Sequence, residues 1–352
     1  IQTIPAGLFA TCTKVDSTSF EAVFMSCPEL HTIEGSIFPE VTTITSMKQI
    51  FFNCPKLTNI PADLFKPLGT AKLKFTNAFT GCTSLKTLPE GLFASCTRAT
   101  HFNSAFADCT ALETIPANLL ASCTELKYVT AMFVGCTSLK SIAIPESVAK
   151  IEGEAFGSCT SLTRVNISDL SAWCNISFGN GSANPLHNKA KLYLNGSELT
   201  DITIPSDITE IKAYAFYYCS SLTSVTIPDS VTSIGDEAFR SCTSLTSVTI
   251  GNSVTSIGQA AFYGCTSLTS VTIGDRVTSI GSYAFCDCTS LKEVYCKPTT
   301  PPSGGSWMFD NNASGRKIYV PRASVDAYKT AYGWSDYAAD IVEYDFENNK
   351  VI

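Results

Sequence analysis

The residues of this chain best suited to chemistry are its 16 cysteines, because thiolates bind zinc, form disulfides and act as nucleophiles. Thirteen of them recur at one regular slot, mostly three residues after a phenylalanine. In two N-terminal half-units the same slot holds Val41 or Leu68. An apolar replacement at an equivalent position indicates a small buried hydrophobic residue. We therefore interpret these thiols, and Cys296 on a strand, as reduced core residues rather than redox or metal groups.

Cys174 and Cys286 fit no slot of this pattern. They are several repeats apart, and repeats stack at about 4.8 Å per turn. That separation exceeds the limit of about 7 Å between the Cα atoms of a disulfide. We expect no disulfide between them, and the sequence assigns neither a role.

Other metal or catalytic signals are weak. His31, His101 and His187 stand in unrelated contexts without the paired spacing of a zinc or hydrolase site. The segment DNNASG at 310–315 copies the first half of a calcium loop, but Pro321 stands where that loop requires glutamate. We interpret it as an asparagine-rich turn. We therefore expect no metal ligands and no cofactors.

The elements that carry these residues repeat at a fixed spacing. The tetrapeptide CTSL or a close variant begins at Cys136, Cys159, Cys219, Cys242, Cys265 and Cys288, mostly 23 residues apart. A fixed period between 20 and 50 residues is the signature of a solenoid. Each unit gains a core only by stacking on its neighbours, so the same residue types return at the same offsets.

The segment 222–244, LTSVTIPDSVTSIGDEAFRSCTS, serves as a model unit. Its first apolar residues follow the L-x-x-L-x-L spacing of leucine-rich repeats, which predicts a first strand. A proline turn at 228–230 and a second, β-branched strand at 231–234 follow. Residues 237–240 can form one helical turn that points a phenylalanine and the ladder cysteine inward.

Stacking of such units predicts a column of phenyl rings. Each buried ring stabilises the fold by roughly 1.5–3 kcal/mol, more than any single intrinsic propensity. The ring should therefore decide the packing of each turn. The members in the 23-residue units are Phe133, Phe156, Phe216, Phe239, Phe262 and Phe285.

The first third has another rhythm, because its ladder cysteines are alternately 14 and 13 residues apart. We interpret each 27-residue pair of half-units as one turn with two strands and two helical turns. The alternative of one turn per half-unit remains open, although such a turn is short for this class.

We expect a single elongated array in three regions. Residues 1–136 form 27-residue double units, residues 137–296 form 23-residue units with an insert near 168–200, and residues 297–352 form a C-terminal cap. Glycine, asparagine and proline in the insert predict a protruding loop, with 192–194 returning to the sheet.

Two further expectations concern the ends of the chain. In the cap, Ser324 can begin a short helix whose Tyr328 and Tyr332 share one face. At the N-terminus Ile1 aligns with Leu112 in the interior of the array, so we expect the natural chain to begin upstream.

Composition narrows the classes of partner. The chain is 45% hydrophobic and 16% charged with a net charge of -7, which disfavours nucleic acid and anionic lipid. It contains no run of 18 apolar residues, so we expect no membrane insertion. Neutral or basic partners suit this charge.

The units SVTIPDSVTSIGDEAFRSCTSL and SVTIGNSVTSIGQAAFYGCTSL closely resemble the BspA-like leucine-rich repeats of bacterial surface proteins. The ending NNASGRKIYVPRASVDAYKTAYGWSDYAADIVEYDF resembles the tail common in such proteins. The resemblance implies an α/β-type, right-handed leucine-rich repeat solenoid with stacked parallel strands, short helical turns and a C-terminal cap. It also implies an exported, cell-surface or secreted protein of an anaerobic bacterium, since some members are associated with binding host matrix proteins or with cell aggregation. Other bacterial surface proteins are therefore a second class of expected partner. No catalytic residues come with it.

Three functional hypotheses remain: a non-catalytic adhesion module for a host extracellular protein or glycan, a purely structural spacer, and an enzyme hidden in the insert. The insert offers Asp169, His187, Lys189 and Lys191 as titratable groups, which is a weak set. The adhesion hypothesis places the ligand on the outward positions of the first strands, where hydroxyl rows offer donors and acceptors. The candidate binding residues are Ser224, Thr226, Ser247, Thr249, Ser270, Thr272, Asn166, Arg164 and Tyr295.

Overall fold

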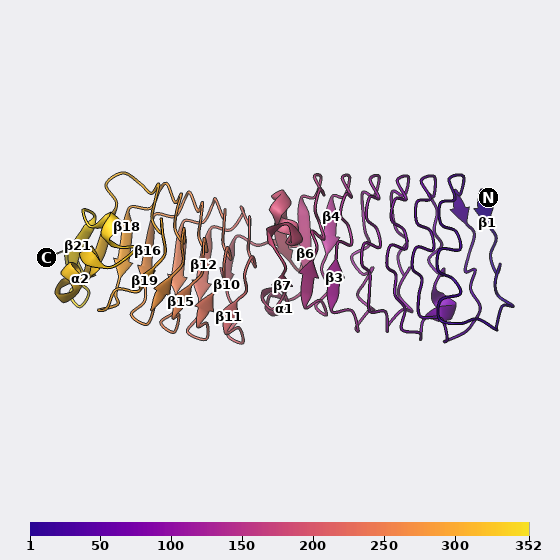
Figure 1. The fold of residues 1–352 in the computed structure, drawn as a ribbon, viewed down its shortest axis with the longest axis horizontal. Helices are drawn as coiled ribbons and strands as arrows, with labels where there is room; N and C mark the ends of the chain where they lie inside the picture. Colours follow the sequence, from indigo (N-terminus) through magenta and orange to yellow (C-terminus); the bar gives the residue numbers. More distant parts are fainter. Residues whose placement is uncertain (352) are drawn as a thin grey trace. The chain divides into compact units, whose positions relative to one another are not determined.

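The computed structural model describes residues 1–351, which form stacked parallel strands of the solenoid type, as predicted (Figure 1). The chain divides into two compact units. The first contains residues 1–172 and 178–196, and the second contains residues 173–177 and the chain from 197 onward. A typical turn of either unit carries a first strand or bridge, a turn, a second strand or bridge and a segment that we call the closing turn, which bears the phenylalanine and the ladder slot.

In the first unit most turns are 27 residues long. Parallel bridges join Thr32 to Asn59 and Thr87 to Thr114, which confirms that two half-units make one turn. The first strands are β1 (Thr3–Ile4), β2 (Thr32–Ile33), β4 (Ser141–Ala143), β6 (Arg164–Ile167) and β8 (Lys191–Leu194). The second strands include β3 (Tyr128–Thr130), β5 (Lys150–Glu152) and β7 (Ser177–Phe178).

In the second unit the turns are mainly 23 residues long, and Ser224 pairs in register with Ser247. The first strands are β10 (Asp201–Thr203), β12 (Ser224–Ile227), β14 (Ser247–Ile250), β16 (Ser270–Ile273), β18 (Glu293–Cys296), β20 (Lys317–Pro321) and β21 (Ile341–Asp345), with β22 (Lys350–Val351) antiparallel to β21. The second strands are β11 (Glu210–Ile211), β13 (Ser233–Ile234), β15 (Ser256–Ile257), β17 (Ser279–Ile280) and β19 (Ser303–Gly304), and β9 (Ser197–Glu198) precedes them.

Helices are few and short among the described residues: α1 (Leu170–Cys174), α2 (Val325–Thr330) and the 3-10 turns η1 (Lys66–Leu68), η2 (Gly181–Ala183), η3 (Pro185–Asn188), η4 (Arg322–Ser324) and η5 (Ser335–Tyr337). Helix α2 ends at Thr330, so the prediction that Tyr332 shares its buried face is wrong. Tyr332 is 79% exposed, whereas Tyr328 is fully buried. The helix stops because the backbone becomes extended at Ala331.

The closing turns are not helical, which corrects the prediction for 237–240. Glu237 and Ser241 lie in the left-handed region, at φ 53° and 60°. Alternate backbone N–H groups of the segment donate to the next turn, as Phe239 does to the Ala261 carbonyl at 2.8 Å. The closing turn thus forms a third hydrogen-bonded row, because bonds between turns satisfy groups that an isolated helical turn would leave open.

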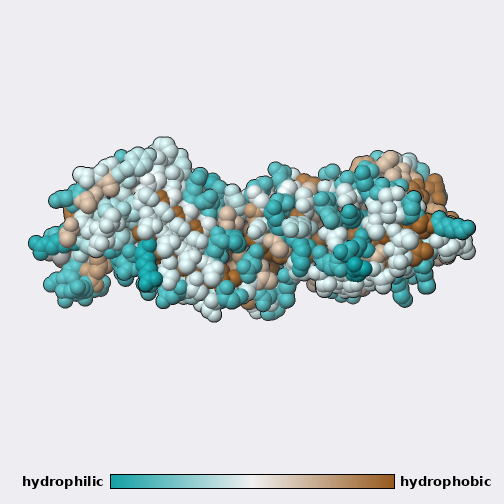
Figure 2. Space-filling view, turned by 60° about the horizontal axis from the view of Figure 1, so that its bottom comes forward, coloured by the Kyte–Doolittle hydropathy of each residue, from teal (hydrophilic) through white to brown (hydrophobic). Residues whose placement is uncertain are grey.

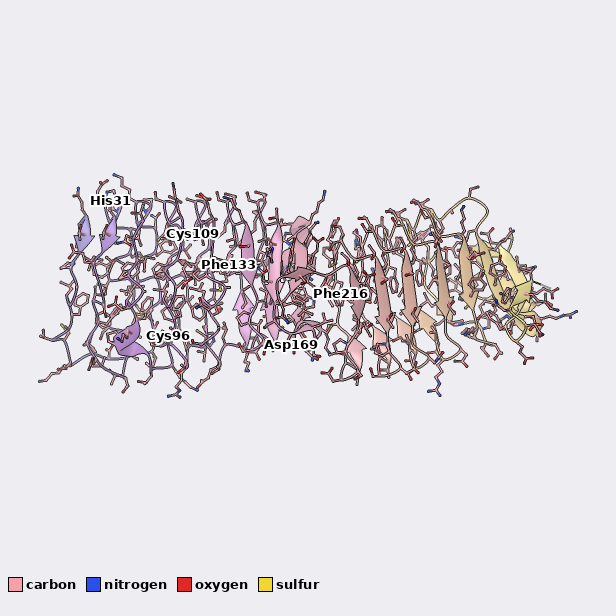
Figure 3. The ribbon with its side chains drawn as sticks, turned by 180° about the vertical axis from the view of Figure 1, so that it is seen from behind. His31, Cys96, Cys109, Phe133, Asp169 and Phe216 are labelled. Carbon is pink, nitrogen blue, oxygen red and sulfur yellow. The ribbon has the colours of Figure 1, made fainter. Side chains whose placement is uncertain are left out.

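The phenyl column exists and passes through every closing turn of the 23-residue units. Phe239 stacks on Phe216 and on Phe262 with ring centroids 5.2 Å apart on both sides and planes within 6°. The column continues to Phe309. In the first unit Phe133 stacks in the same way and is buried, as is Cys109, whereas His31 lies exposed at an edge (Figure 3).

The thiols of the main column do more than fill space. The Cys109 Sγ donates to the Phe79 carbonyl at 3.2 Å, and the Cys242 Sγ donates to the Phe216 carbonyl at 3.3 Å. Each thiol therefore bonds to the phenylalanine one turn earlier. The same bond is made by Cys54, Cys82, Cys136, Cys159, Cys265 and Cys288.

The slots held by Val41 and Leu68 belong to the other half-unit column, together with Cys96 and Cys123. These cysteines do not donate to a phenylalanine carbonyl within residues 1–351. The apolar interpretation therefore fits that column, and it is incomplete for the main column. There most residues of the slot donate a hydrogen bond to the preceding turn as well as filling a small space.

Two asparagines make the same bond from the main slot. The Asn312 Nδ2 donates to the Phe285 carbonyl at 2.8 Å, and the Asn188 Nδ2 donates to the Phe156 carbonyl at 3.1 Å. Each asparagine replaces the cysteine of its turn, and an amide and a thiol share the ability to donate. Asn188 therefore continues the column through the insert.

The insert is not the protruding loop that its composition predicts. Asn184, Pro185 and Leu186 are fully or almost fully buried, and two asparagine side chains accept backbone N–H bonds at the starts of η2 and η3. The predicted return to the sheet is confirmed, since β8 pairs with β6 in parallel register from Arg164 and Lys191 onward. The insert is a 27-residue turn of the array itself.

The C-terminal region covers the last ring of the column with other aromatic side chains. Trp334 is fully buried with its ring centroid 5.9 Å from that of Phe309. Nearby, the buried Arg316 donates to the Asp340 carboxylate at 2.5 Å, and its guanidinium lies 4.9 Å from the Tyr337 ring. The carboxylate and the aromatic face offset part of the cost of burying this cation.

Burial also sets the reactivity of the thiols. It raises the pKa of the Cys54 thiol to about 11 and that of Cys159 to about 12, and it holds the pKa of Cys242 well above the usual range. Fourteen of the sixteen cysteines are buried, whereas Cys12 is exposed and Cys27 is half-buried. All sixteen are free thiols.

The phenyl column predicts a large loss on truncation. Replacing Phe239 by Ala should lower the free energy of unfolding by roughly 3–5 kcal/mol, because the two neighbouring rings would border a cavity. Equilibrium denaturation in urea measures this change. A loss below about 1 kcal/mol would show that the ring is not packed in the core.

The donor requirement predicts a difference between two cysteine columns. Cys109→Ala and Cys123→Ala remove the same atoms from fully buried sites, but only Cys109 donates to a phenylalanine carbonyl. We expect Cys109→Ala to cost roughly 0.5–1 kcal/mol more, the usual worth of a weak hydrogen bond. If both variants lose the same free energy of unfolding in matched denaturation curves, the thiol of the main slot contributes only packing.

The raised thiol pKa values predict slow labelling of the folded protein. The thiolate is the reactive form, and a pKa of 11 or more leaves little of it at pH 8. Iodoacetamide at pH 8 should modify Cys12 and Cys27 first and the fourteen buried thiols only after unfolding. Mass spectrometry after denaturation without reductant should then count sixteen adducts, and a smaller count would reveal disulfides.

Candidate functional site on the first-strand face

The predicted binding residues of the second unit lie on its first strands with their side chains directed outward. Thr226 and Thr249 are exposed and pair directly across β12 and β14. Thr272 is exposed and pairs with Tyr295 across β16 and β18. The buried residues of the same strands, such as Val225, alternate with them, as the two-residue period of a strand requires.

The sheet is interrupted between Thr249 and Thr272. Among the described residues β14 pairs with β12, and β16 begins a separate sheet with β18. A hollow of about 480 Å³ lies at this break, and it is lined by both threonines together with Lys297 and Asp229. The sequence predicted a continuous hydroxyl row, so the hollow is a feature that regular spacing did not reveal.

A glycine lies beside the break. An added Cβ on Gly251 would meet the Pro228 backbone at 2.6 Å, whereas one on Gly274 would stay 3.9 Å from the Gly251 carbonyl oxygen. The turn at Gly251 therefore approaches the preceding turn closely and leaves more room toward the following one. The hollow opens on that roomier side, where Ile250 is half-buried rather than buried.

Not every predicted hydroxyl is available to a ligand. The Ser224 Oγ donates to the Asp201 Oδ1 at 2.5 Å, and this bond is the main reason why the pKa of Asp201 is lowered. Ser247 is exposed and Ser270 is half-buried on the adjacent turns. The Ser224 hydroxyl proton is therefore already engaged by a neighbouring carboxylate and is not free to bind a ligand.

Tyr295 ends the threonine column with an aromatic cluster. Its ring stacks on Tyr319 at 4.8 Å and meets the Tyr344 ring edge-on at 5.3 Å. Burial, with a smaller contribution from Glu293, raises the pKa of Tyr295 to about 12. The phenol thus stays neutral and can donate a hydrogen bond over the physiological pH range.

The remaining predicted residues, Arg164 and Asn166, lie side by side on β6 in the first unit. The Arg164 Nε donates to the Asn166 Oδ1 at 2.8 Å, and its guanidinium lies 3.7 Å above the Tyr193 ring. The Asn166 Nδ2 donates to the Ile142 carbonyl at 3.3 Å. Arg164 therefore positions Asn166 and is itself held by an aromatic face and the Gly196 carbonyl.

Asn166 also lines a pocket of about 680 Å³ in the first unit. Most of the lining is apolar or backbone, and Glu146 and Asn195 supply polar groups. The Ser168 Oγ donates to the Glu146 carboxylate at 2.7 Å. Sequence reasoning missed Glu146, although the change from 27-residue to 23-residue turns at this point was visible in the spacing.

The titratable residues of the insert serve the local backbone. The Asp169 Oδ1 accepts the Ala172 N–H at 2.7 Å, and the His187 Nδ1 lies 2.8 Å from the Asn184 carbonyl. Lys189 is exposed in the left-handed region where η3 ends, and Lys191 lies on β8. Figure 3 places Asp169 at an edge of the stack.

The asparagine-rich segment at 310–315 is used in the same structural way. The Asp310 Oδ1 accepts the Tyr337 hydroxyl at 2.7 Å, and the Asn311 Nδ2 donates to Asp287 at 2.8 Å. Over residues 1–351 no group of three or more His, Cys, Asp or Glu side chains is arranged to hold a metal ion. No helix in the same range has the length and apolar character of a membrane span.

One face of the molecule is mostly polar or of intermediate hydropathy (Figure 2). Figure 2 shows one face on which hydrophilic and intermediate residues cover most of the area, with apolar patches scattered between them. The intermediate colour corresponds to the many serine and threonine side chains of the repeats. Polar contacts are therefore the main chemistry that this face offers to a partner.

Comparison with known proteins places the chain in context. The family model for the BspA type leucine rich repeat region matches residues 75–183 and 189–315 in six copies, which is more than half of the chain. A leucine-rich repeat protein from Bacteroides ovatus is similar in structure, with 23% identity, a TM-score of 0.52 and coverage of 98% of this chain and 92% of that one. A leucine rich cell surface protein from Faecalibacterium prausnitzii has 24% identity, a TM-score of 0.47 and coverage of 93% and 85%. No curated protein matches the chain.

Proposed function

Because the chain belongs to the BspA-type leucine-rich repeat family, we propose that it is a cell-surface or secreted adhesion module that binds through its first-strand face. Leucine-rich repeat families are in general non-catalytic, and we propose the same for this chain. The partner is a host extracellular protein or glycan. Other bacterial surface proteins are a second class of partner for the same face.

The observation that carries the proposal is the hollow at Thr249 and Thr272. Two exposed hydroxyls, a lysine at position 297 and an aspartate at position 229 surround a space of about 480 Å³. Hydroxyls donate and accept, and the two charges of opposite sign can each meet a polar group of a partner. A peptide backbone and a sugar both present such mixed donors and acceptors.

Charge supports the choice of partner. The chain carries a net charge of -7, so electrostatic attraction favours neutral or basic surfaces over nucleic acid. Interfaces of this polar kind also hold bridging water, which does not weaken them. The candidate face therefore suits a protein or glycan with many hydrogen-bonding groups.

The alternative function, a structural spacer, has its own supporting observation. The Oγ1 atoms of Thr232, Thr255 and Thr278 each donate to the carbonyl of the preceding turn at 3.0–3.2 Å. Many hydroxyls of the repeats thus stabilise the stack itself. Under the spacer hypothesis the outward threonines of the first strands would only be solvated.

The proposal predicts loss of retention when the threonine column becomes basic. Replacing Thr226, Thr249 and Thr272 together by Lys should reduce retention on a surface coated with host matrix protein or mucin-type glycan by at least about tenfold, because bulk and charge enter the face. Thermal unfolding should change little, since the three side chains point outward. Surface plasmon resonance measures the retention.

The matched control is the triple change of Thr243, Thr266 and Thr289 to Lys. These residues are also 23 residues apart but lie in the CTSL loops outside the hollow, where Thr266 and Thr289 make only long hydroxyl bonds of 3.4 and 3.5 Å to the preceding turn. Both variants add the same charge at the same spacing along the stack. Equal retention by parent and first variant rejects the face as the site, and absence of binding by the parent across a broad protein and glycan panel favours the spacer.

A further inference from the structure

The pocket of the first unit lies where the form of the repeat changes. In a 27-residue turn the first and second strands are joined by a wide turn, such as 116–123, which contains three successive bonds between residues i and i+3. In the next turn of the array a tight turn at 145–148 replaces it, with one such bond from the Val148 N–H to the Pro145 carbonyl. The array thus steps down by four residues at this point.

The step explains why the pocket exists. Ala117, Ala121 and Thr124 of the wide turn before the step form one wall, and Pro145 and Glu146 of the tight turn border the other side. Earlier wide turns face another wide turn, but this one faces a shorter segment. The space of about 680 Å³ therefore lies where a further wide turn would otherwise continue the array.

Most side-chain donors of the pocket lining are already engaged, because those of Thr124, Asn166, Ser168 and Asn195 donate to protein oxygens. Among the described lining residues Glu146 is the one charged side chain, and it is exposed at the rim. The Ser168 hydroxyl donates to its carboxylate, and the Asn195 Nδ2 donates to the Ser168 carbonyl at 3.2 Å, which fixes the neighbouring wall. A carboxylate on a preset wall favours a cationic group.

We propose that this pocket binds a short polypeptide segment in which an apolar side chain is next to a lysine or arginine. The apolar side chain enters between Ala121 and Ile167, and the basic group pairs with Glu146 at the rim. This inference deepens the proposed adhesive function, on which it rests, because it gives the first-strand face of the first unit a partner of defined chemistry.

Two features favour a polypeptide over a free small molecule. The pocket takes the place of a chain turn in a repeating stack, so its shape suits one turn of main chain with a side chain. One wall carries the small side chains of Ala117 and Ala121, which leave room for a peptide backbone beside them. A volume of this size suits one anchoring side chain with its flanks rather than a folded domain.

The test uses a phage library of random heptapeptides selected on the parent protein and on three variants. Ala121→Trp fills the pocket from an exposed position. Ala94→Trp is the matched control, because Ala94 is equally exposed at the equivalent position one turn earlier and outside the pocket lining. Glu146→Gln removes the charge and keeps the size.

We expect the parent and Ala94→Trp to enrich the same apolar-plus-basic motif, and Ala121→Trp to lose that enrichment by at least tenfold. Glu146→Gln should weaken a synthetic copy of the leading peptide about two- to fivefold, the worth of an exposed ion pair. A copy with norleucine in place of its basic residue should bind the parent and Glu146→Gln alike. Fluorescence anisotropy measures these affinities.

Three outcomes would overturn the inference: no motif on the parent beyond that on Ala121→Trp, a motif without a basic residue, or an acidic motif. The threonine column lies in the second unit, so its lysine variant tests adhesion separately. Failure of adhesion with a motif at the pocket leaves the inference in place. If the protein is retained on a matrix or glycan surface but selects no peptide motif, the pocket inference is overturned and the proposed adhesive function stands.

Discussion

Most closing turns bring two groups into the interior that the next turn must meet, a phenyl ring and the carbonyl of the same phenylalanine. The ring stacks on an equivalent ring, as Phe239 does on Phe262. The carbonyl accepts a thiol, as from Cys265, or an amide, as from Asn312. Because both contacts join neighbouring turns, a unit outside the array lacks them, and the repeats fold only as a stack.

This constraint divides each repeat into fixed and free positions. Inward residues and the threonines that donate between turns are set by their neighbours in the stack, as for Thr255 on Thr232. Outward positions of the first strands escape the constraint, and the chain places Thr272, Tyr295 and Asn166 there in different turns. These outward positions recur at a constant spacing and can vary in residue type. A solenoid can therefore acquire a binding function there without loss of its core.

The sequence predicted what periodicity controls: the solenoid, the 27-residue and 23-residue turns, the parallel register and the phenyl column. The sequence-based prediction failed where one side chain both fills space and makes a hydrogen bond. Val41 and Leu68 suggested that every ladder cysteine is apolar, because sequence alone does not separate the two half-unit columns. Composition likewise suggested a loop for the insert, although Asn188 keeps its turn in register through one side-chain bond.

The two candidate sites were beyond sequence reasoning because each arises from a departure from regularity. The hollow at Thr249 lies where two strands of the array do not pair, and the pocket at Glu146 lies where a wide turn meets a tight one. A perfectly regular stack covers each turn with the next and leaves only shallow relief. Concave space with converging polar groups therefore requires an irregular step, and a change of repeat length marks one such step in the sequence.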